Sequence, residues 1–292
     1  MSPEIDKNIS SIVAQHYNNR PNVDVDKRKG SVIIRLKSFN NWIKSILLAN
    51  YTRPGDKFLD LGCGKGGDLL KLAKHSISEL VGVDIAENSI EEATNRYNSL
   101  RNKSFSARFY TLDCFSNPIS QVIQPYDFLA NVVSMQFCFH YAFETEQKAR
   151  QALKNVSDHL EIGGYFIGTT TNSYWLTKKL HSVPGKEFGN SVYHVRFEEK
   201  YSKKVFGRGY WFTLEDAIED CPEYLIHFPT LQKLALEYNL ELLVNSSFHD
   251  YYAQNISFPS NKALMRRMKV IDENGNGPSD DEWEAAGNKI KL

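Results

Sequence analysis

One stretch constrains this chain more than any other: residues 58–72 read FLDLGCGKGGDLLKL. Phe58, Leu59 and Leu61 form a short apolar run, which is typical of the end of a buried strand. Four glycines follow between 62 and 67, and leucines then resume at helical spacing. Glycines let the backbone approach a ligand closely, and a helix start offers free N–H groups. This strand–turn–helix unit therefore predicts a nucleotide-type binding loop.

The residues around the loop discriminate between ligands. A Walker phosphate loop needs Lys and then Ser or Thr after Gly67, but Asp68 and Leu69 follow it. The glycine spacing fits a dinucleotide, and Asp84 lies where a ribose partner is expected. Asp60, however, would repel a pyrophosphate, whereas a carboxylate suits a ligand with an ammonium and a sulfonium. These residues favour S-adenosylmethionine (SAM) over a ligand-free glycine turn.

Composition limits the function classes. The 292 residues are 41% hydrophobic, which is enough to bury a core. The formal charge is zero, so a long nucleic acid held mainly through its backbone is not expected, and any basic site must be local. The four cysteines are scattered without a Cys-x-x-Cys pair, which argues against a zinc site or a disulfide framework and fits a reducing compartment. We expect no bound metal.

The termini and the apolar runs bear on location. No apolar run approaches membrane-spanning length, and the first residues, MSPEIDKNIS, do not resemble a secretory signal. We therefore expect a soluble, intracellular protein that makes no contact with a membrane.

Strand and helix patterns alternate along most of the chain. The predicted strands lie at 57–61, 80–84, 107–112, 127–135 and 164–170, and the predicted helices at 38–50, 67–75, 87–100 and 145–160. This order predicts an α/β fold with a doubly wound, mostly parallel, Rossmann-like methyltransferase sheet and helices on both faces. Ligands of such sheets bind at the carboxyl ends of the strands, where the glycine loop and Asp84 fall.

The second half of the chain interrupts this alternation. Residues 186–228 are β-rich and predict an antiparallel insertion, followed by a helix at 229–239 and a strand at 240–246. We expect the polar tail at 272–292 to run along the surface. All of this forms one domain over 1–292, which begins with a helical segment at 1–50.

Several longer motifs resemble one known family. They are HYNNR at 16–20, FNNWIKS at 39–45, LDLGCGKGGDLLK at 59–71, VDIAENSI at 83–90, QFCFHYAFE at 136–144 and GGYFIGTTTNS at 163–173. Together they resemble the messenger RNA cap guanine-N7 methyltransferases, over residues 12–270. The resemblance implies methyl transfer from SAM to N7 of the guanosine cap of mRNA. It also implies a nuclear location and, as partners, capped RNA and other capping enzymes or the transcription machinery.

The resemblance implies a cofactor site at the strand ends. Lys44 would contact the carboxylate of SAM, Gly62 would offer its backbone, and Asp84 would bind the ribose hydroxyls. Taken alone, a lysine such as Lys44 is more often a solvated surface charge. The residues that would contact the adenine edge or close over the cofactor are Asp113, Gln136 and Tyr141.

The capped end of RNA is a guanosine joined through a triphosphate, so the acceptor site needs cations. The resemblance implies Lys65, Lys71 and Arg96 for the triphosphate, flanked by Asn40 and Asn41. Each basic residue taken singly could instead belong to a solvated helix face.

The same resemblance implies a guanine pocket formed by Phe137, His140, Tyr210 and Glu223. Guanine N7 carries a lone pair and no proton, so alignment of the reactants can replace a general base. Glu223 would accept from N1–H and the 2-amino group and stabilise the positive charge of the product, and His140 would donate to O6. As alternatives, His140 could be a core histidine and Glu223 a turn residue.

Two other functions fit parts of the sequence. A SAM methyltransferase acting on a small molecule would have a similar loop but no purpose for Lys65, Lys71 and Arg96. A non-catalytic cap-binding subunit would not need the intact acids Asp60 and Asp84.

Near its end the chain departs from the family pattern. Relatives usually continue after EWEA with a strand of the type Tyr-x-x-Phe-x-Phe-x-Lys, whose tyrosine lines the guanine pocket, but here EWEAAG at 282–287 is followed by NKIKL. We therefore expect no closing strand, an exposed sheet edge and weaker cap affinity, with Tyr251 or Tyr252 as candidates to fill the gap. The family's long basic N-terminal extension is also absent from these 292 residues, so we expect recruitment to transcription through other surfaces or through partners.

Overall fold

A central sheet organises the chain in the computed structural model, which describes residues 9–19, 30–101 and 103–291. Its seven strands are β1 Lys57–Leu61, β2 Glu79–Asp84, β3 Ser106–Thr111, β4 Ala130–Gln136, β5 Leu160–Thr171, β10 Ser246–Ser247 and β11 Lys289–Lys291. They lie in the order β10-β11-β5-β4-β1-β2-β3. The first five strands along the chain pair in parallel, and β11 pairs antiparallel with both β5 and β10. The predicted mostly parallel sheet is confirmed.

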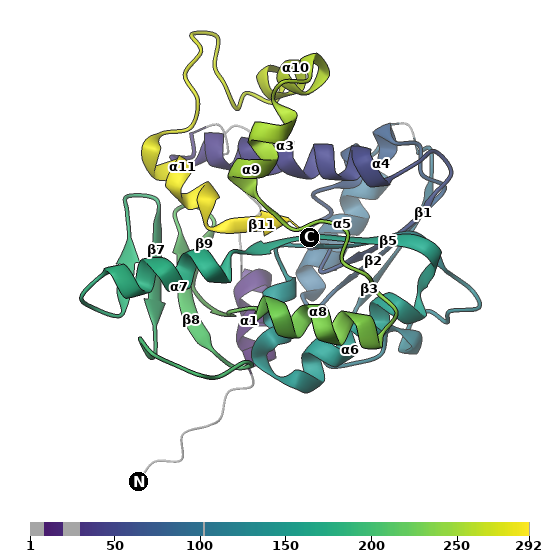
Figure 1. Ribbon diagram of the computed structural model, residues 1–292. Coiled ribbons are helices and arrows are strands. Elements are labelled where there is room, and N and C mark those ends of the chain that lie inside the picture. Colours follow the sequence, from purple (N-terminus) through teal and green to yellow (C-terminus); the bar gives the residue numbers. More distant parts are fainter. Residues whose placement is uncertain (1–8, 20–29, 102, 292) are drawn as a thin grey trace.

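Helices cover both faces of this sheet (Figure 1). One face packs against α3 Ile34–Tyr51, α4 Leu69–Lys74 and α5 Glu87–Asn98, and the other against α6 Glu146–Asp158 and α8 Phe228–Glu237. The alternation of side chains along the strands explains the two layers. Phe58 and Leu80 join the α3 side, whereas Leu59 and Val81 join the α6 side. Helix α1 Ile9–Asn19 packs near α5 and the α6-side core through Val13.

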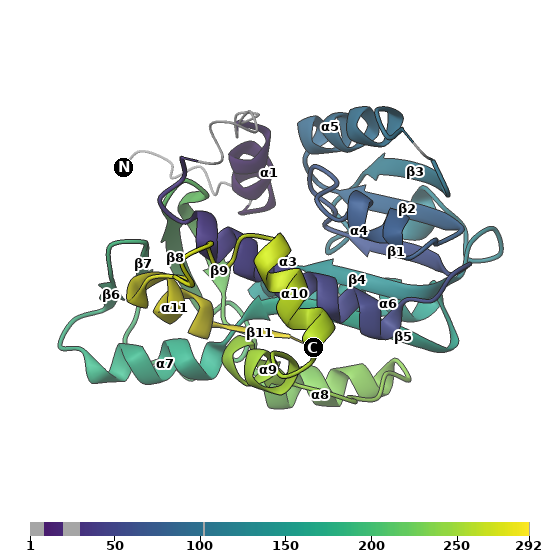
Figure 2. The ribbon, with the colours of Figure 1, turned by 90° about the horizontal axis from the view of Figure 1, so that it is seen from above.

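The predicted antiparallel insertion is present as a separate sheet. Its strands are β6 Glu187–Gly189, β7 Tyr193–Phe197, β8 Gly209–Leu214 and β9 Ile218–Tyr224, in that order. Seen from above, this sheet lies beside the large one, and α3 extends across both (Figure 2). Phe39 and Trp42 on α3 pack into the core of the insertion, while Leu47 and Leu48 pack on the large sheet. One helix thus fixes the insertion against the carboxyl ends of the parallel strands.

The remaining elements complete the two layers. They are the short helices η1 Ile119–Gln121 and η2 Phe139–Glu144, and the α-helices α7 Ser173–Ser182, α9 Phe248–Asn255, α10 Pro259–Arg267 and α11 Asp280–Gly287. Among the described residues, no helix is long and apolar enough to cross a membrane.

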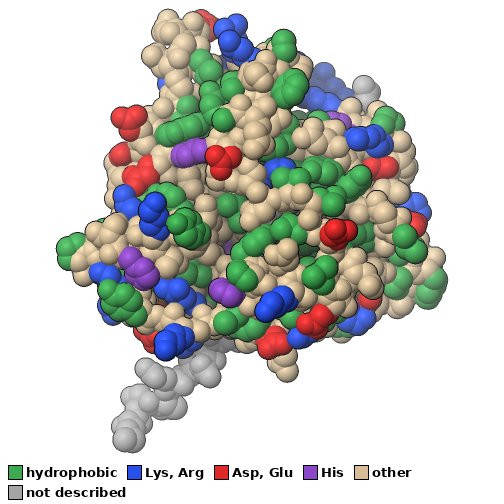
Figure 3. Space-filling view, in the orientation of Figure 1, with side chains coloured by type: hydrophobic (Ala, Val, Ile, Leu, Met, Phe, Trp, Pro, Cys, Tyr) green, Lys and Arg blue, Asp and Glu red, His purple; other side chains and the backbone are tan. Residues whose placement is uncertain are grey.

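The strand predicted at 240–246 is wrong in its extent. Only Ser246 and Ser247 pair, because their partner β11 is itself three residues long. Residues 240–245 have no ladder to join, and Leu243 stays 64% exposed. Leu236 on α8 is likewise 59% exposed. In the orientation of Figure 1, hydrophobic side chains are scattered among charged ones over the visible face (Figure 3).

The prediction of a surface tail without a closing strand is also wrong. Ser279 and Glu282 form a capping box that starts α11, and Ala285 and Ala286 on this helix are buried. The chain then turns into β11, so Lys289–Lys291 supplies the closing strand between β5 and β10. The two lysines of this strand are buried. Lysines are rarely buried, so their presence in the sequence predicts a solvated segment.

Candidate active site

The glycine loop leaves β1 in a conformation that needs glycine. Gly62 has φ +75°, and a Cβ there would lie 2.6 Å from Cys138 Sγ. The Gly62 N–H donates to the carbonyl of Val83 at 2.7 Å, which ties the loop to the end of β2. The loop therefore packs tightly against the segment that leads into η2, and its side-chain-free surface is open to a ligand.

Asp84 supports the loop from the end of β2. Its Oδ2 accepts from the Gly64 N–H at 2.8 Å, and its Oδ1 accepts from the Ala86 N–H at 2.9 Å. Burial raises the pKa of this carboxyl, and the backbone N–H donors oppose that change. A carboxylate has about four lone-pair sites, more than these backbone donors occupy, so hydroxyl groups of a ligand can still bind here.

Asp60 is a buried acid without adequate counter-charge. Burial raises its pKa to about 8, and the neighbouring carboxylates of Asp68 and Asp84 add to this effect. Lys44 and Lys71 lower the pKa only in part. A cationic ligand at this position would favour the ionised form of Asp60.

Asp68, which sequence reasoning did not assign, holds two lysines together. Its Oδ2 accepts from Lys44 Nζ at 2.8 Å, and its Oδ1 accepts from Lys71 Nζ at 2.7 Å. Lys71 also donates to Asn41 Oδ1 at 3.0 Å. Burial alone would raise the pKa of Asp68, but the two ammonium groups lower it to about 2. The lysine expected for the SAM carboxylate and one expected for the triphosphate thus share one partner.

A second cluster of polar side chains lies where the two sheets meet. The Tyr210 hydroxyl hydrogen-bonds with Glu223 Oε2 at 2.6 Å and with Thr171 Oγ1 at 3.0 Å. His140 Nε2 is buried without a hydrogen bond and lies 3.5 Å from Glu223 Oε1. Burial lowers the pKa of His140, so this contact is a neutral imidazole beside a carboxylate rather than an ion pair.

The two groups are neighbours. Cys138, which touches the loop at Gly62, precedes His140 by two residues, and its thiol donates to the Leu61 carbonyl at 3.1 Å. The short segment from Cys138 to His140 therefore connects the glycine loop with the Glu223 group.

The sequence of this chain matches those of known proteins. Residues 1–291 match the family described as mRNA (guanine-N(7))-methyltransferase domain. The chain belongs to this family. An mRNA cap guanine-N(7) methyltransferase of Cryptococcus neoformans is 44% identical over 285 residues, covering 94% of this chain and 46% of the relative. One from Schizosaccharomyces pombe is 44% identical over 290 residues, covering 96% of this chain and 80% of the relative. The chain thus spans about half the length of the first relative.

A solved structure supports the fold of this family member. A methyltransferase from Streptomyces caelestis superimposes with a TM-score of 0.54 at 13% identity, covering 96% of this chain and 94% of that one. The family predicted from the motifs is confirmed, and so is the methyltransferase-like fold.

The remaining cofactor residues of this family member are engaged with the protein itself. Gln136 accepts from the Thr169 hydroxyl and donates to Ser134, and Asp113 accepts bonds within its own turn. Tyr141 is buried with its hydroxyl 3.2 Å from that of Tyr17. Their contacts with SAM stay a prediction.

The structure brings only some of the residues predicted to bind the RNA cap close to one another. Asn40 Oδ1 is buried without a hydrogen-bond partner, and Phe137 (φ +59°) packs edge-on against Phe248. Lys65 lies in the glycine loop itself. Arg96 lies in the last turn of α5, which runs back from the strand ends, and pairs with Glu92 at 2.8 Å. Its role at a triphosphate stays a prediction.

The two tyrosines proposed as replacements have other partners. The Tyr251 hydroxyl accepts from Asn50, and Tyr252 packs against Phe39, Trp42 and Trp283. Strand β11 instead brings Lys289 toward Glu223. Burial lowers the pKa of this lysine, and the charge of Glu223 opposes that change.

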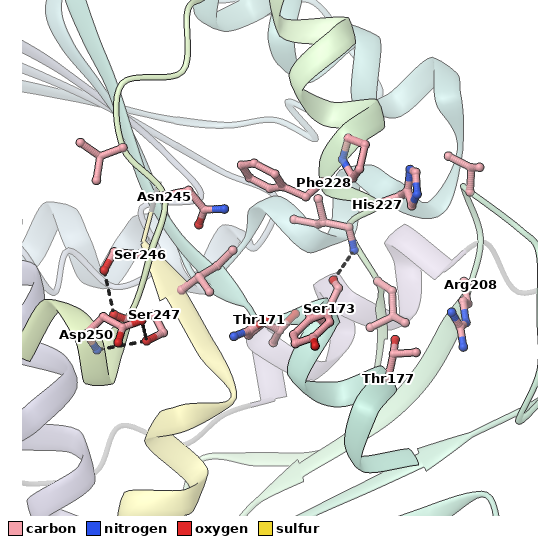
Figure 4. A pocket seen from close by; sticks show the side chains of 18 of the residues that line it. Thr171, Ser173, Thr177, Arg208, His227, Phe228, Asn245, Ser246, Ser247 and Asp250 are labelled. Carbon is pink, nitrogen blue, oxygen red and sulfur yellow. Dashed lines mark hydrogen bonds between the residues drawn. The ribbon is translucent and has the colours of Figure 1, made fainter. Parts of the chain in front are cut away.

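A hollow of about 870 Å³ opens beside β11 (Figure 4). Ile290 lines it, together with Thr171, Ser173, Arg208 and His227. None of the residues predicted for the two ligands lines this hollow. Within the described residues, no group of three or more His, Cys, Asp or Glu side chains could hold a metal ion.

Proposed function

We propose that this chain transfers a methyl group from SAM to N7 of the guanosine cap at the 5′ end of mRNA. The observation that carries the proposal is the buried group of Glu223, Tyr210 and His140 beside the glycine loop. A carboxylate matches the two donors of guanine, N1–H and the 2-amino group, and a neutral histidine can donate to O6. Adenine offers an acceptor at N1, so the same group discriminates against it.

The cofactor side fits SAM by its shape and its charges. The positive-φ glycines leave a cradle that a Cβ would fill, and the Asp60 carboxyl requires a cation to ionise near neutral pH. SAM, when bound, supplies an electrophilic methyl carbon on a sulfonium. Asp84 has lone pairs left for the ribose hydroxyls, and Lys44 can leave Asp68 for a carboxylate.

The chain's own residues perform the reaction by positioning and charge. Guanine N7 releases no proton, so no side chain needs to act as a base. Glu223 stabilises the positive charge that develops on the purine, and the Tyr210 hydroxyl donates to Glu223 and fixes its orientation. His140 lacks a partner for Nε2 and donates from that nitrogen to O6. Lys65, Lys71 and Arg96 bind the triphosphate.

The proposed reaction also implies a cellular location and partners for the protein. Capped transcripts arise where RNA is made, so we place this activity in the nucleus, alongside other capping enzymes or the transcription machinery.

The experiment measures transfer from methyl-labelled SAM to guanosine-capped RNA, with guanosine triphosphate and a panel of small acceptors in parallel. We expect label in N7-methylguanosine on the capped RNA. Glu223→Gln keeps the shape but places a donor opposite donors, so its kcat/KM should fall by about a hundredfold or more. Ser104→Ala, at an exposed position, serves as the control.

The two alternatives predict other results. A small-molecule methyltransferase would label a member of the panel and leave capped RNA unlabelled. A cap-binding subunit would bind a cap analogue without transferring label. A loss of less than fivefold in Glu223→Gln would remove Glu223 from the guanine pocket.

A further inference from the structure

A buried lysine lies behind the guanine-edge group. Lys289 is the first residue of β11 and is 5% exposed. Its Nζ donates to the Ala285 carbonyl at 2.9 Å and to Asn288 Oδ1 at 3.0 Å. An ammonium group has three donors and loses a large hydration energy on burial, so a position this deep calls for a counter-charge.

The strand register places Lys289 beside the Glu223 network. In the antiparallel pair of β5 and β11, Lys289 lies opposite Thr171. Opposite residues of such a pair project their side chains from the same face of the sheet. The Thr171 hydroxyl is 3.0 Å from that of Tyr210, which is 2.6 Å from Glu223 Oε2. Ile290, the next residue, lies opposite Thr170 and lines the hollow of Figure 4.

The electrostatics agree with this placement. Burial lowers the pKa of Lys289 to about 8, and the negative charge of Glu223 opposes that change. At pH 7 the lysine is therefore mainly protonated. Glu223 is itself 2% exposed, and a lone carboxylate at that depth is costly to keep ionised.

We propose that Lys289 is a positioning residue for cap methylation, whose ammonium group is the counter-charge that holds the Glu223 carboxylate directed at the guanine edge. The inference rests on the proposed function and deepens it. Lys289 acts through Glu223 and does not touch the substrate. The competing reading is structural: Lys289 satisfies the end of α11 through Ala285 and does nothing else.

Other titratable groups surround this lysine. Glu223 on β9 acts on its charge, and Tyr210 on β8 and His140 on η2 adjoin Glu223. The helices that contact β11 carry Glu282 on α11, and His249 and Tyr251 on α9. Burial raises the pKa of Tyr210 and Tyr251 and lowers that of His140, away from the range between pH 7 and 9. The pKa of Lys289 lies inside that range, so loss of its charge should reduce activity above pH 8.

The chain offers a matched control for the test. Lys291 lies two residues further along the same strand and is 3% exposed, but its Nζ sits 4.3 Å from the ring centre of Tyr251. We expect Lys289→Met to lower kcat/KM for capped RNA about tenfold, the scale of losing one buried charge interaction, and Lys291→Met to lower it less than threefold. SAM affinity should stay unchanged in both variants. Equal losses in the two variants would overturn the proposal.

A double-mutant cycle separates positioning from structure. If Lys289 acts through Glu223, then Lys289→Met should cost little in a Glu223→Gln background. If it only supports α11, the two losses should multiply, which would overturn the proposal. The pH profile of Lys289→Arg gives an independent result even where Lys289→Met folds poorly. Arginine stays charged, so its activity should persist above pH 8, where the wild type declines.

The outcome is distinct from that of the proposed function. Wild-type methylation of capped RNA tests the reaction, and only the variants test Lys289. Asp60 also titrates near pH 8, but its effect is common to the wild type and Lys289→Arg. An identical alkaline decline in these two proteins would contradict the role of Lys289.

Discussion

Asp60 and Asp68 are both buried, yet their pKa values move in opposite directions. Burial would raise the pKa of Asp68, but hydrogen bonds from two ammonium groups bring it to about 2. Asp60 faces the charges of Asp68 and Asp84, and its pKa rises to about 8. Asp68 is therefore an anion at neutral pH and holds two lysines in place, whereas Asp60 ionises at neutral pH only when a cation binds beside it.

This difference makes SAM binding sensitive to pH. Asp60 holds a proton in the free protein below pH 8 and should release it when a cationic ligand binds. Affinity should then rise about tenfold per pH unit toward pH 8 and level off above it, since one group titrates. Calorimetry at several pH values, in buffers that differ in ionisation heat, measures both the affinity and the released proton.

Asp60→Asn is the control for that measurement. It removes the titration and should bind SAM weakly at every pH, with no proton released. If the wild type bound SAM equally at pH 6 and pH 8, Asp60 would not face the cationic part of the ligand.

At the scale of elements, the C-terminal helix and strand depend on one cap. The Ser279 hydroxyl accepts from the Glu282 N–H, and the Glu282 carboxylate accepts from the Ser279 N–H at 2.9 Å and from the Leu36 N–H on α3. The cap therefore starts α11 and also attaches it to α3. Because β11 follows directly, the same cap holds Lys289 in place.

Ser279→Ala should lower the free energy of unfolding by about 1 kcal/mol, the usual effect of losing an N-cap. Chemical denaturation measures it, with Ser104→Ala, at an exposed position, as the control. A loss as small as that of the control would show that α11 is held by packing alone.

How far the sequence predicts these elements depends on where their partners lie. The apolar runs of β1 and β2 pair with each other through adjacent crossovers, so their positions follow from local pattern. Residues 240–245 also carry an apolar pattern, but their ladder requires β11, some forty positions further along the chain. Likewise, Lys44 and Asp68 are 24 positions apart, and a lysine in a helix gives no sign of such a partner.

At the scale of the whole molecule, the cofactor side and the acceptor side are mechanically joined. Helix α3 carries Asn41 and Lys44 and packs against both sheets. The loop helix α4 carries Lys71, and Asp68 binds a lysine from each helix. The formal charge of the chain is zero, so attraction for a triphosphate comes from these few residues rather than from an overall field.

The pairing with Asp68 distinguishes Lys71 from Lys65, although both lysines are predicted from the sequence to bind the triphosphate. Lys65→Gln should weaken binding of a cap analogue and reduce its salt dependence, because one phosphate contact is lost, and should leave SAM affinity unchanged. Lys71→Gln should weaken both ligands. Asp68 would then pair with Lys44 alone, and Asp60 would lose one of the two charges that lower its pKa. Calorimetry of SAM and of a cap analogue with each variant measures the four affinities, and unchanged SAM affinity in Lys71→Gln would mean that Asp68 does not couple the two sides.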